Sequence, residues 1–371
     1  MSAPPPPLRV LVVDDSPTVR GRIVEVLGAA PGIAVVGQAA SGDEAVELCR
    51  ALRPDVLTLD VVLPGCSGVV VTEWVMAYCP TPILIVSGSS ERGEAFRTHD
   101  ALAAGAVDVL DKPGAGGGDP EAWARELVAR VRLVARVTPI PHVAARRRAR
   151  WGGGSRPPAS PATRDLADPD APSPALGEAR LVAIGASTGG TRAVAELLAG
   201  LPADFPLPVL LVLHLSPLFG ESFAEWLAGR VPFPVALARD GEPLPPPGAC
   251  RVVVAPPGRH LVVRGGRLRL DDGPERHSCR PAVDALFESL AAELGPGVIA
   301  CLLTGMGRDG ASGLLRLRQA GALTLAQDEA TSTVYGMPAE AARLGAAREV
   351  LPLPAFAATL VAAAAHTGSG A

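Results

Sequence analysis

Short apolar runs alternate with amphipathic stretches along two long segments of this chain, and this alternation is the strongest constraint on its fold. In the first segment, residues 8–136, each apolar run has the length of a buried strand, and the stretches between them have helical spacing. The apolar runs are residues 8–13, 33–38, 55–59, 83–87 and 107–110. Five such strand–helix units predict an α/β domain with a doubly wound parallel sheet.

The second segment, residues 179–366, shows the same alternation. Its predicted strands are residues 181–185, 209–214, 251–255 and 298–304, and its helical patterns are residues 191–199, 222–228, 283–293 and 312–320. Between two further apolar runs stands Gly265-Gly266, which is typical of a β-hairpin turn. We therefore expect a second α/β domain, with a Rossmann-like doubly wound parallel sheet and one β-hairpin.

Residues 137–178 interrupt the alternation. They contain three consecutive arginines at 146–148, three glycines at 152–154, and then a stretch rich in proline, alanine, serine and aspartate. Such a composition cannot bury a core, so it predicts a flexible linker between the two domains. The arginines could contact an acidic surface, but a solvated run is the better interpretation.

Composition excludes several classes of function. A net charge of -4 gives no general attraction to nucleic acid or to an anionic membrane. No apolar run approaches the roughly 20 residues needed for membrane insertion, and the N-terminus does not resemble a signal peptide. The six cysteines lack zinc-like or C-x-x-C spacing and are expected to be reduced. These features predict a cytoplasmic protein without nucleic-acid partners.

Acidic and cationic residues follow the strands of the first segment. Asp14 and Asp15 follow the first strand, Asp60 the third, Ser87 ends the fourth, and Lys112, the only lysine of the chain, follows the fifth. Because the carboxyl ends of parallel strands share one edge, these side chains should meet. Clustered carboxylates favour a cation such as Mg²⁺, and an ammonium can pair with a phosphoryl group. The alternative is that each aspartate merely caps the helix that follows it. That alternative would be sufficient for a single aspartate, but it does not explain why polar residues of these types follow four of the strands.

The sequences VVDDS, DVLTLDVVLPG, VSGSS and DKP resemble those of response-regulator receiver domains, so residues 8–136 are identified as a flavodoxin-like receiver. The resemblance implies that a histidine kinase is the phosphodonor and Asp60 the phosphoacceptor. It also implies that Asp14, Asp15 and Asp60 bind Mg²⁺, and that Ser87 and Lys112 contact the phosphoryl group. The chain departs from the usual pattern at Val62 and Ser67, where acidic residues are common, and at Val109, where an aromatic switch residue is typical.

A serine in the second segment lies at a strand-to-helix turn. Ser187, in Gly-Ala-Ser-Thr-Gly-Gly, stands where free backbone N–H groups can stabilise an oxyanion. It could instead be a helix cap, or the glycines could bind a dinucleotide, although their spacing fits that motif poorly. His214 and Asp309 also follow strands. Each alone could be an ordinary polar residue, but together the three offer a nucleophile, a base and a residue that orients the base.

The sequences IGASTGGT, LHLSP, APPGRH, DDGPERHSCRP, LLTGMGRDG and AQDEATSTVYGMP, in this order, resemble the catalytic domain of chemotaxis protein-glutamate methylesterases, the CheB family. That family also carries a receiver in front. The resemblance implies Ser187 as nucleophile, His214 as base and Asp309 as its orienting partner. It further implies an oxyanion hole formed by the backbone N–H of Met306 and the turn after Ser187, with Thr188 and His260 lining the site. No cofactor is expected at the esterase site.

The resemblance implies a phosphorylation-controlled serine esterase. Its substrates would be glutamate γ-methyl esters on methyl-accepting chemoreceptors, with methanol released, and receptor glutamines could be deamidated by the same chemistry. Two alternatives stay open. One is a non-catalytic binding module controlled by phosphorylation, in which Ser187 is only a helix cap. The other is a receiver-linked esterase that acts on a protein outside chemotaxis.

Overall fold

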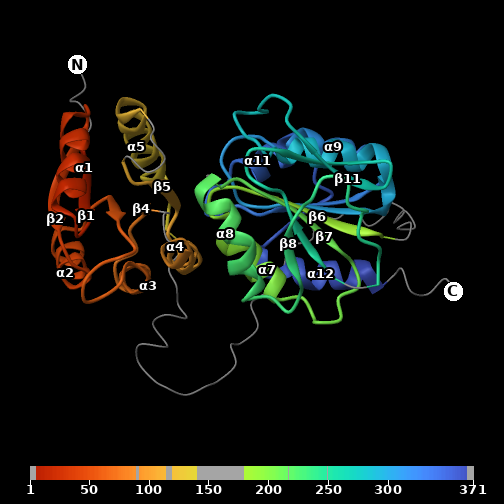
Figure 1. Ribbon diagram of the computed structural model, residues 1–371, viewed down its shortest axis with the longest axis horizontal. Coiled ribbons are helices and arrows are strands. Elements are labelled where there is room, and N and C mark those ends of the chain that lie inside the picture. Colours follow the sequence, from red (N-terminus) through yellow and green to blue (C-terminus); the bar gives the residue numbers. More distant parts are fainter. Residues whose placement is uncertain are drawn as a thin grey trace.

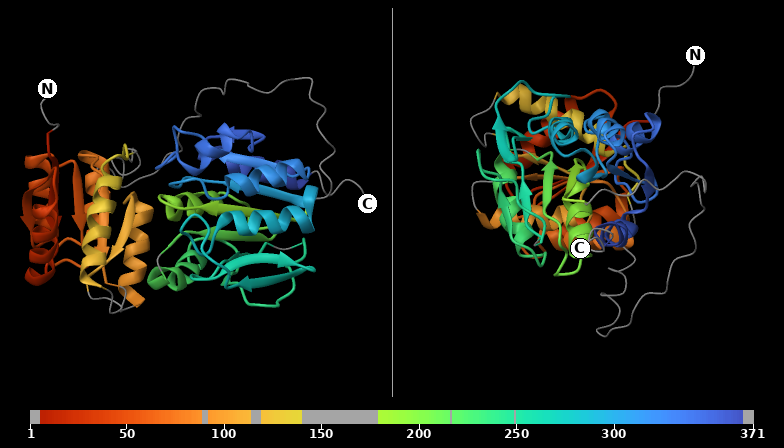
Figure 2. Two further views of the ribbon diagram at one scale, coloured as in Figure 1. Left: turned by 90° about the horizontal axis from the view of Figure 1, so that it is seen from above. Right: turned by 90° about the vertical axis from the view of Figure 1, so that its right-hand side faces the viewer.

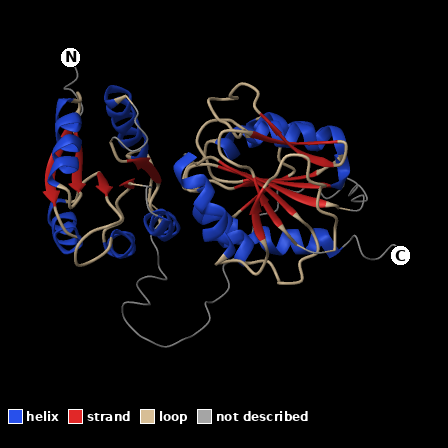
Figure 3. Ribbon diagram, in the orientation of Figure 1, coloured by secondary structure: helices blue, strands red, loops and turns tan. Residues whose placement is uncertain are grey.

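The structure is a computed structural model that describes residues 6–88, 92–113, 119–139, 179–215, 217–248 and 250–365. The predicted α/β fold is confirmed in both segments (Figures 1 and 3). Almost all of the predicted linker, residues 137–178, lies outside the described residues. Among the described helices, none combines the length and apolar character needed to cross a bilayer.

The N-terminal domain contains a parallel sheet with the strand order β2-β1-β3-β4-β5. The strands are β1 (Leu8–Val13), β2 (Ile33–Ala39), β3 (Val56–Leu59), β4 (Ile83–Ser87) and β5 (Asp108–Asp111). The helices are α1 (Pro17–Ala29), α2 (Gly42–Leu52), α3 (Gly68–Tyr78), α4 (Arg92–Ala104) and α5 (Pro120–Val134). Separate hydrophobic clusters lie under α1 and α5 on one face and under α2, α3 and α4 on the other, as a doubly wound sheet requires.

The C-terminal domain contains a larger parallel sheet, whose described strands run in the order β14-β13-β12-β6-β7-β9-β8. These strands are β6 (Leu181–Ala186), β7 (Val209–Leu213), β8 (Val235–Leu237), β9 (Val252–Val254), β12 (Val298–Leu302), β13 (Leu323–Gln327) and β14 (Glu349–Leu351). The helices are α7 (Gly190–Ala199), α8 (Pro217–Ala228), α9 (Val283–Glu293), α10 (Ala311–Gln319), α11 (Met337–Arg343) and α12 (Leu353–Ala365), with a short 3-10 turn, η1 (Gly295–Gly297), before β12. Strands β6, β7 and β12 are adjacent, so the loops that follow them share one edge.

The predicted β-hairpin is formed by β10 (His260–Arg264) and β11 (Arg267–Asp271), which pair antiparallel. Gly265 and Gly266 both have positive φ, 58° and 66°, as the two central residues of a type I′ turn must. The structure adds β8, β13, β14, α11 and α12, for which the sequence analysis named no element.

The two domains are in contact through α4, which packs against α7 and α8 (Figure 2). Phe219 of α8 is fully buried and belongs to the hydrophobic cluster of the N-terminal domain. His99 of α4 has its Nε2 3.2 Å from Phe219 O and 3.0 Å from Ser222 Oγ. Asp100 accepts hydrogen bonds from Trp226 Nε1, at 2.9 Å, and from the Arg230 guanidinium. The interface is therefore a packed apolar contact bordered by an ion pair.

Candidate active site and phosphoacceptor site

Asp60 lies at the end of β3 beside two other carboxylates. Carboxylate oxygens of Asp14, Asp15 and Asp60 lie within 4.8 Å of one another. Lys112 Nζ is 2.7 Å from Asp60 Oδ2 and 3.3 Å from Asp14 Oδ2. The structure thus brings together the strand-end residues that the sequence singled out, apart from Ser87.

The charges at this cluster are only partly balanced. Burial raises the pKa of Asp60 to about 6 and also raises the pKa of Asp14, although Lys112 acts in the opposite direction on both. Asp14 Oδ2 is buried, and apart from its ion pair with Lys112 it has no hydrogen-bond partner. Oxygen ligands with an unmet need for positive charge are what a hard divalent cation requires, so the three carboxylates fit Mg²⁺.

Ser87 ends β4, and two of the three departures from the receiver pattern, Val62 and Val109, lie after β3 and within β5. The Ser87 hydroxyl donates to Glu94 Oε1 at 2.8 Å, so it would have to rotate to reach a phosphoryl oxygen. Val62 is partly exposed after β3. Val109 is buried in β5, in the same hydrophobic cluster as Phe219 of the other domain. The aliphatic side chain at position 109 therefore contributes to packing on the side of the domain interface.

Ser187 lies on the turn that joins β6 to α7. Its own N–H donates to Thr304 O at 3.0 Å, and Gly190 N donates to Ser187 O at 2.7 Å. Gly189 has a φ of 77°, and a Cβ there would collide with the side chain of Thr333, so only glycine suits this turn. Among the described residues, the backbone N–H groups of Thr188 and Met306 have no hydrogen-bond acceptor. They are available to a ligand oxygen.

His214 and Asp309 form a hydrogen-bonded pair. His214 Nε2 is 3.0 Å from Asp309 Oδ2. The Asp309 carboxylate also accepts from Val283 N at 2.6 Å, Asp284 N at 3.0 Å and Gly310 N at 2.9 Å. Within the described part of the chain, no hydrogen bond joins Ser187 Oγ to His214, although both residues line the same cleft.

These contacts set the protonation of the pair. Burial opposes ionisation of Asp309, but the hydrogen bonds from His214 and from the backbone outweigh it and lower the pKa of Asp309. Burial alone would lower the pKa of His214, but contacts with Asp309 and Cys279 raise it to about 9. Asp309 is therefore ionised over a wide pH range, as a residue that orients a histidine must be.

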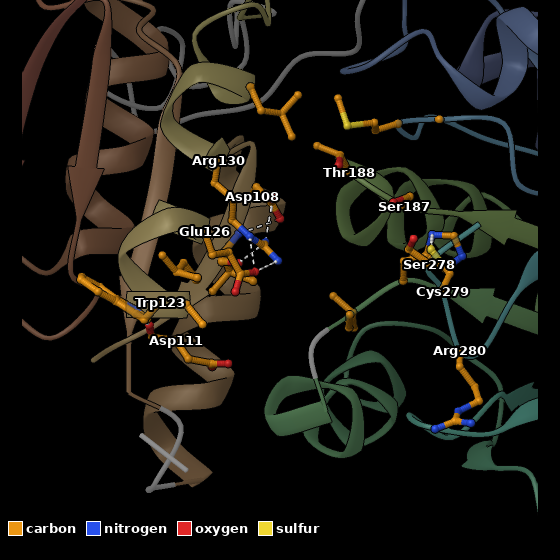
Figure 4. A pocket seen from close by; sticks show the side chains of 18 of the residues that line it. Asp108, Asp111, Trp123, Glu126, Arg130, Ser187, Thr188, Ser278, Cys279 and Arg280 are labelled. Carbon is orange, nitrogen blue, oxygen red and sulfur yellow. Dashed lines mark hydrogen bonds and ion pairs between the residues drawn. The ribbon is translucent and has the colours of Figure 1, made fainter. Parts of the chain in front are cut away.

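The cleft around Ser187 has a volume of about 980 Å³ and is lined by both domains. Figure 4 shows Ser187, Thr188 and Cys279 on one wall, opposite Asp108 and Arg130 on the other. His214 and Met306 line the cleft as well.

His260 differs from the expectation that it lines the site. It is buried and is not among the described residues that line the cleft. Its Nε2 is 3.0 Å from Pro274 O, and its Nδ1 accepts from Ala282 N at 3.1 Å. Both ring nitrogens thus bind backbone groups, which fastens the hairpin to the segment before α9.

Two residues that the sequence analysis did not assign to the site contribute to it. Cys279 Sγ is 3.6 Å from His214 Nδ1. Asp284 is buried behind Asp309 and accepts from His277 Nε2 at 3.0 Å and Gly313 N at 2.7 Å. Cys279 lies in a segment with weak strand and helix signals, and only the family motif DDGPERHSCRP pointed to it. Asp284 lies in the predicted helix 283–293, where nothing distinguishes it from an ordinary residue of the first turn.

The chain is similar to known proteins along nearly its whole length. The model of the CheB methylesterase family matches residues 182–360, and that of the response regulator receiver domain matches residues 10–117. The protein-glutamate methylesterase/protein-glutamine glutaminase of Nitrosospira multiformis is 44% identical over 365 residues, covering 97% of this chain and 98% of the relative. A Pseudomonas aeruginosa protein of the same name, numbered 2, is 44% identical over 369 residues, covering 98% and 99%.

Among solved structures, the catalytic domain of Thermotoga maritima CheB methylesterase is 34% identical, with a TM-score of 0.47, covering 50% of this chain and 98% of that one. The order of a receiver followed by a methylesterase domain, and the extent of similarity to full-length relatives, decide the classification. This chain belongs to the CheB family of response-regulator protein-glutamate methylesterases.

Proposed function

We propose that this protein is a phosphorylation-controlled serine esterase that hydrolyses glutamate γ-methyl esters on chemoreceptors and releases methanol. The observation that carries the proposal is that the His214–Asp309 pair lies in the same cleft as Ser187. Ser187 itself precedes the start of α7, close in the chain to the free N–H group of Thr188. The names of the relatives, which join methylesterase and glutaminase, support both ester hydrolysis and deamidation of receptor glutamines.

The hydrogen bonding of His214 assigns its two nitrogens. Because Nε2 donates to Asp309, Nδ1 of the neutral ring is the atom that takes the proton of Ser187. Ser187 Oγ then attacks the ester carbonyl. The resulting oxyanion would be held by the N–H groups of Thr188 and Met306, each worth about 3–4 kcal/mol of transition-state stabilisation.

The intermediate then collapses to an acyl-enzyme. His214 returns its proton to the leaving oxygen, and methanol departs. The same nitrogen next removes a proton from water, which attacks the acyl-enzyme and restores Ser187 with a free glutamate as product. With glutamine as substrate, ammonia leaves in place of methanol.

The receiver would control access to this site. A histidine kinase would phosphorylate Asp60, and Asp14, Asp15 and Asp60 would hold Mg²⁺, which neutralises the carboxylates and the phosphoryl oxygens. The phosphoryl group adds about -1.5 to -2 charges beside Lys112, a residue that also lines the cleft. We infer that the docked receiver narrows the entrance to Ser187 and that phosphorylation opens it.

Methanol release from methylated receptor membranes by the purified full-length protein tests this function. We expect release by the wild type, a higher rate with a small-molecule phosphodonor and Mg²⁺, and no such rise in Asp60→Asn. Ser187→Ala should release none. Folded protein without methanol release would favour the non-catalytic binding module, whereas hydrolysis of small esters but not of receptor esters would favour a different protein target.

A further inference from the structure

The nitrogen of His214 that faces away from Asp309 is in contact with a cysteine. Cys279 Sγ lies 3.6 Å from His214 Nδ1, the atom that must accept the proton of Ser187 in the proposed reaction. Of the six cysteines, Cys279 is the one that lines the described cleft. The contact can therefore influence whether His214 Nδ1 carries a proton.

The surroundings of the thiol indicate the direction of this contact. A thiol has one proton, and Cys279 donates it to His277 O at 3.4 Å. The sulfur lone pairs are then left to accept from His214 Nδ1. Because Nε2–H already donates to Asp309, Nδ1 carries a proton only when the ring is an imidazolium. The arrangement is thus complementary to the protonated form of His214.

The sulfur is fixed in place by a tight turn. Arg276 and Cys279 exchange two backbone hydrogen bonds, of 3.1 and 2.9 Å, and the two residues between them, His277 and Ser278, have positive φ. The guanidinium of Arg276 makes two hydrogen bonds to Glu288, of 2.8 and 2.9 Å. A sulfur held on such a turn cannot easily leave the imidazole.

We propose that Cys279 is a positioning residue that stabilises His214 in its protonated, inactive form and thereby sets the pH at which the esterase becomes active. This inference rests on the proposed function, since it takes His214 as the base. In agreement with the geometry, the hydrogen bonds to Asp309 and Cys279 raise the pKa of His214 to about 9 against the effect of burial.

Other charged groups line the cleft that contains His214, and several of them form hydrogen bonds to partners other than His214. Those of the same domain that line the cleft are Glu275, His277 and Arg280. Those of the receiver that line it are Arg22, Asp108, Asp111, Lys112, Asp119, Glu126 and Arg130. His277 is bonded to Asp284, Arg280 to backbone carbonyls, and Arg130 to Asp108, so Asp309 and Cys279 are the groups in hydrogen-bond contact with the base.

The test is the pH profile of methanol release by the full-length protein between pH 6 and 10, with uncatalysed hydrolysis subtracted. In Cys279→Ala we expect the midpoint to fall by about one pH unit, the rate near pH 7 to rise about three- to tenfold, and KM to stay unchanged. In Cys279→Ser a hydroxyl oxygen can still accept from Nδ1, so the midpoint should stay close to that of the wild type. Cys66→Ala, in the receiver, is the matched control and should change nothing.

A nitrogen-15 NMR titration of His214 in the Ser187→Ala background gives a readout that does not depend on turnover. Both ring nitrogens should be protonated at pH 7, and Cys279→Ala should lower the pKa seen in the titration. An unshifted midpoint and pKa in Cys279→Ala, or an equal loss of activity at every pH in the alanine and serine variants, would overturn the inference. Full activity in Ser187→Ala would instead refute the proposed function.

Discussion

Two buried aspartates occupy equivalent places in the two domains and behave in opposite ways. Asp60 and Asp309 both follow a central strand of a parallel sheet, and each is only 1% exposed. The pKa of Asp60 is raised by burial, whereas hydrogen bonds lower the pKa of Asp309 despite burial. The difference lies in what surrounds them. Asp309 receives three backbone N–H groups and an imidazole. Asp60 receives one backbone N–H, from Val62, and one ammonium, and it faces two carboxylates.

The comparison shows that the carboxylate of Asp309 is already stabilised in its ionised form, whereas the carboxylates around Asp60 still lack compensating positive charge. Asp309 needs nothing further to orient His214. Asp60 has a pKa of about 6 in the folded protein, against an ordinary value of 3.8, so the folded state binds its proton more tightly than the unfolded state does. The contribution of Asp60 to the folding stability of the receiver is therefore lost as the pH rises from about 4 to about 6. At pH 7 the ionised form costs roughly 2–3 kcal/mol, which a bound cation can offset.

The largest effect is expected at the esterase site. Ser187→Ala should reduce methanol release by about 10⁴-fold or more, and Asp309→Asn by about 10³–10⁴-fold, because the amide no longer favours the required tautomer of His214. Steady-state rates check this, with Ser312→Ala, an exposed serine of α10, as the control. If Asp309→Asn instead makes the domain less stable, but the fraction that remains folded keeps its specific activity, then Asp309 is only a helix cap.

The receiver site should respond in the opposite sense to loss of its carboxylate. Asp60→Asn removes a charge that is costly at neutral pH, so without Mg²⁺ we expect the receiver to gain about 1–2 kcal/mol of stability at pH 7.5. Mg²⁺ should stabilise the wild type more than this variant. Urea unfolding with and without Mg²⁺ measures both effects, with Glu47→Gln on α2 as a surface control. A less stable Asp60→Asn would mean that its ion pair with Lys112 outweighs the desolvation of the carboxylate.

The contact between the domains should have a smaller influence on activity. Arg230 pairs with Asp100 and lies 4.2 Å above the Trp226 ring, so Arg230→Ala should weaken docking by about 1 kcal/mol. Unphosphorylated enzyme should then release methanol up to about fivefold faster. The exposed Arg239→Ala is the control. Unchanged rates in Arg230→Ala would argue that docking does not limit access to Ser187.

Docking itself should also depend on pH. Burial at the interface lowers the pKa of His99 to about 4, whereas an exposed histidine titrates near 6.5. The undocked form therefore binds more protons, so docking is strongest above about pH 6.5 and weakens as the pH falls toward 4. Small-angle scattering between pH 7.5 and 5 should show the protein expanding. His99→Gln should not show this trend, and expansion equal to that of the wild type would assign it to other groups.

Much of both sites could be predicted because parallel strands bring their carboxyl ends together. Asp14, Asp60 and Lys112 come from three strands whose order along the sequence is enough to place them at one edge. The same rule places Ser187, His214 and Asp309 after β6, β7 and β12. The methylesterase function itself came from the family resemblance, and the comparisons confirm that family.

Other features have no such signal in the sequence. Cys279 reaches His214 through a turn in which two residues other than glycine have positive φ, and no propensity predicts that. Phe219 has the spacing of an ordinary core residue of its own helix, yet it is buried in the other domain's cluster. The sequence does not indicate in which of two domains an apolar side chain will be buried, so the interface between the domains could not be predicted from it.

The single lysine of the chain has a practical consequence for chemistry aimed at amines. Lys112 is the only ε-amino group in the protein, and 19% of its side chain is exposed. An acylating or cross-linking reagent that reacts with a lysine here must react beside Asp60 and at the rim of the cleft that holds Ser187. A label on Lys112 therefore reports on both sites at once, and peptide mapping distinguishes it from a label on an α-amino group.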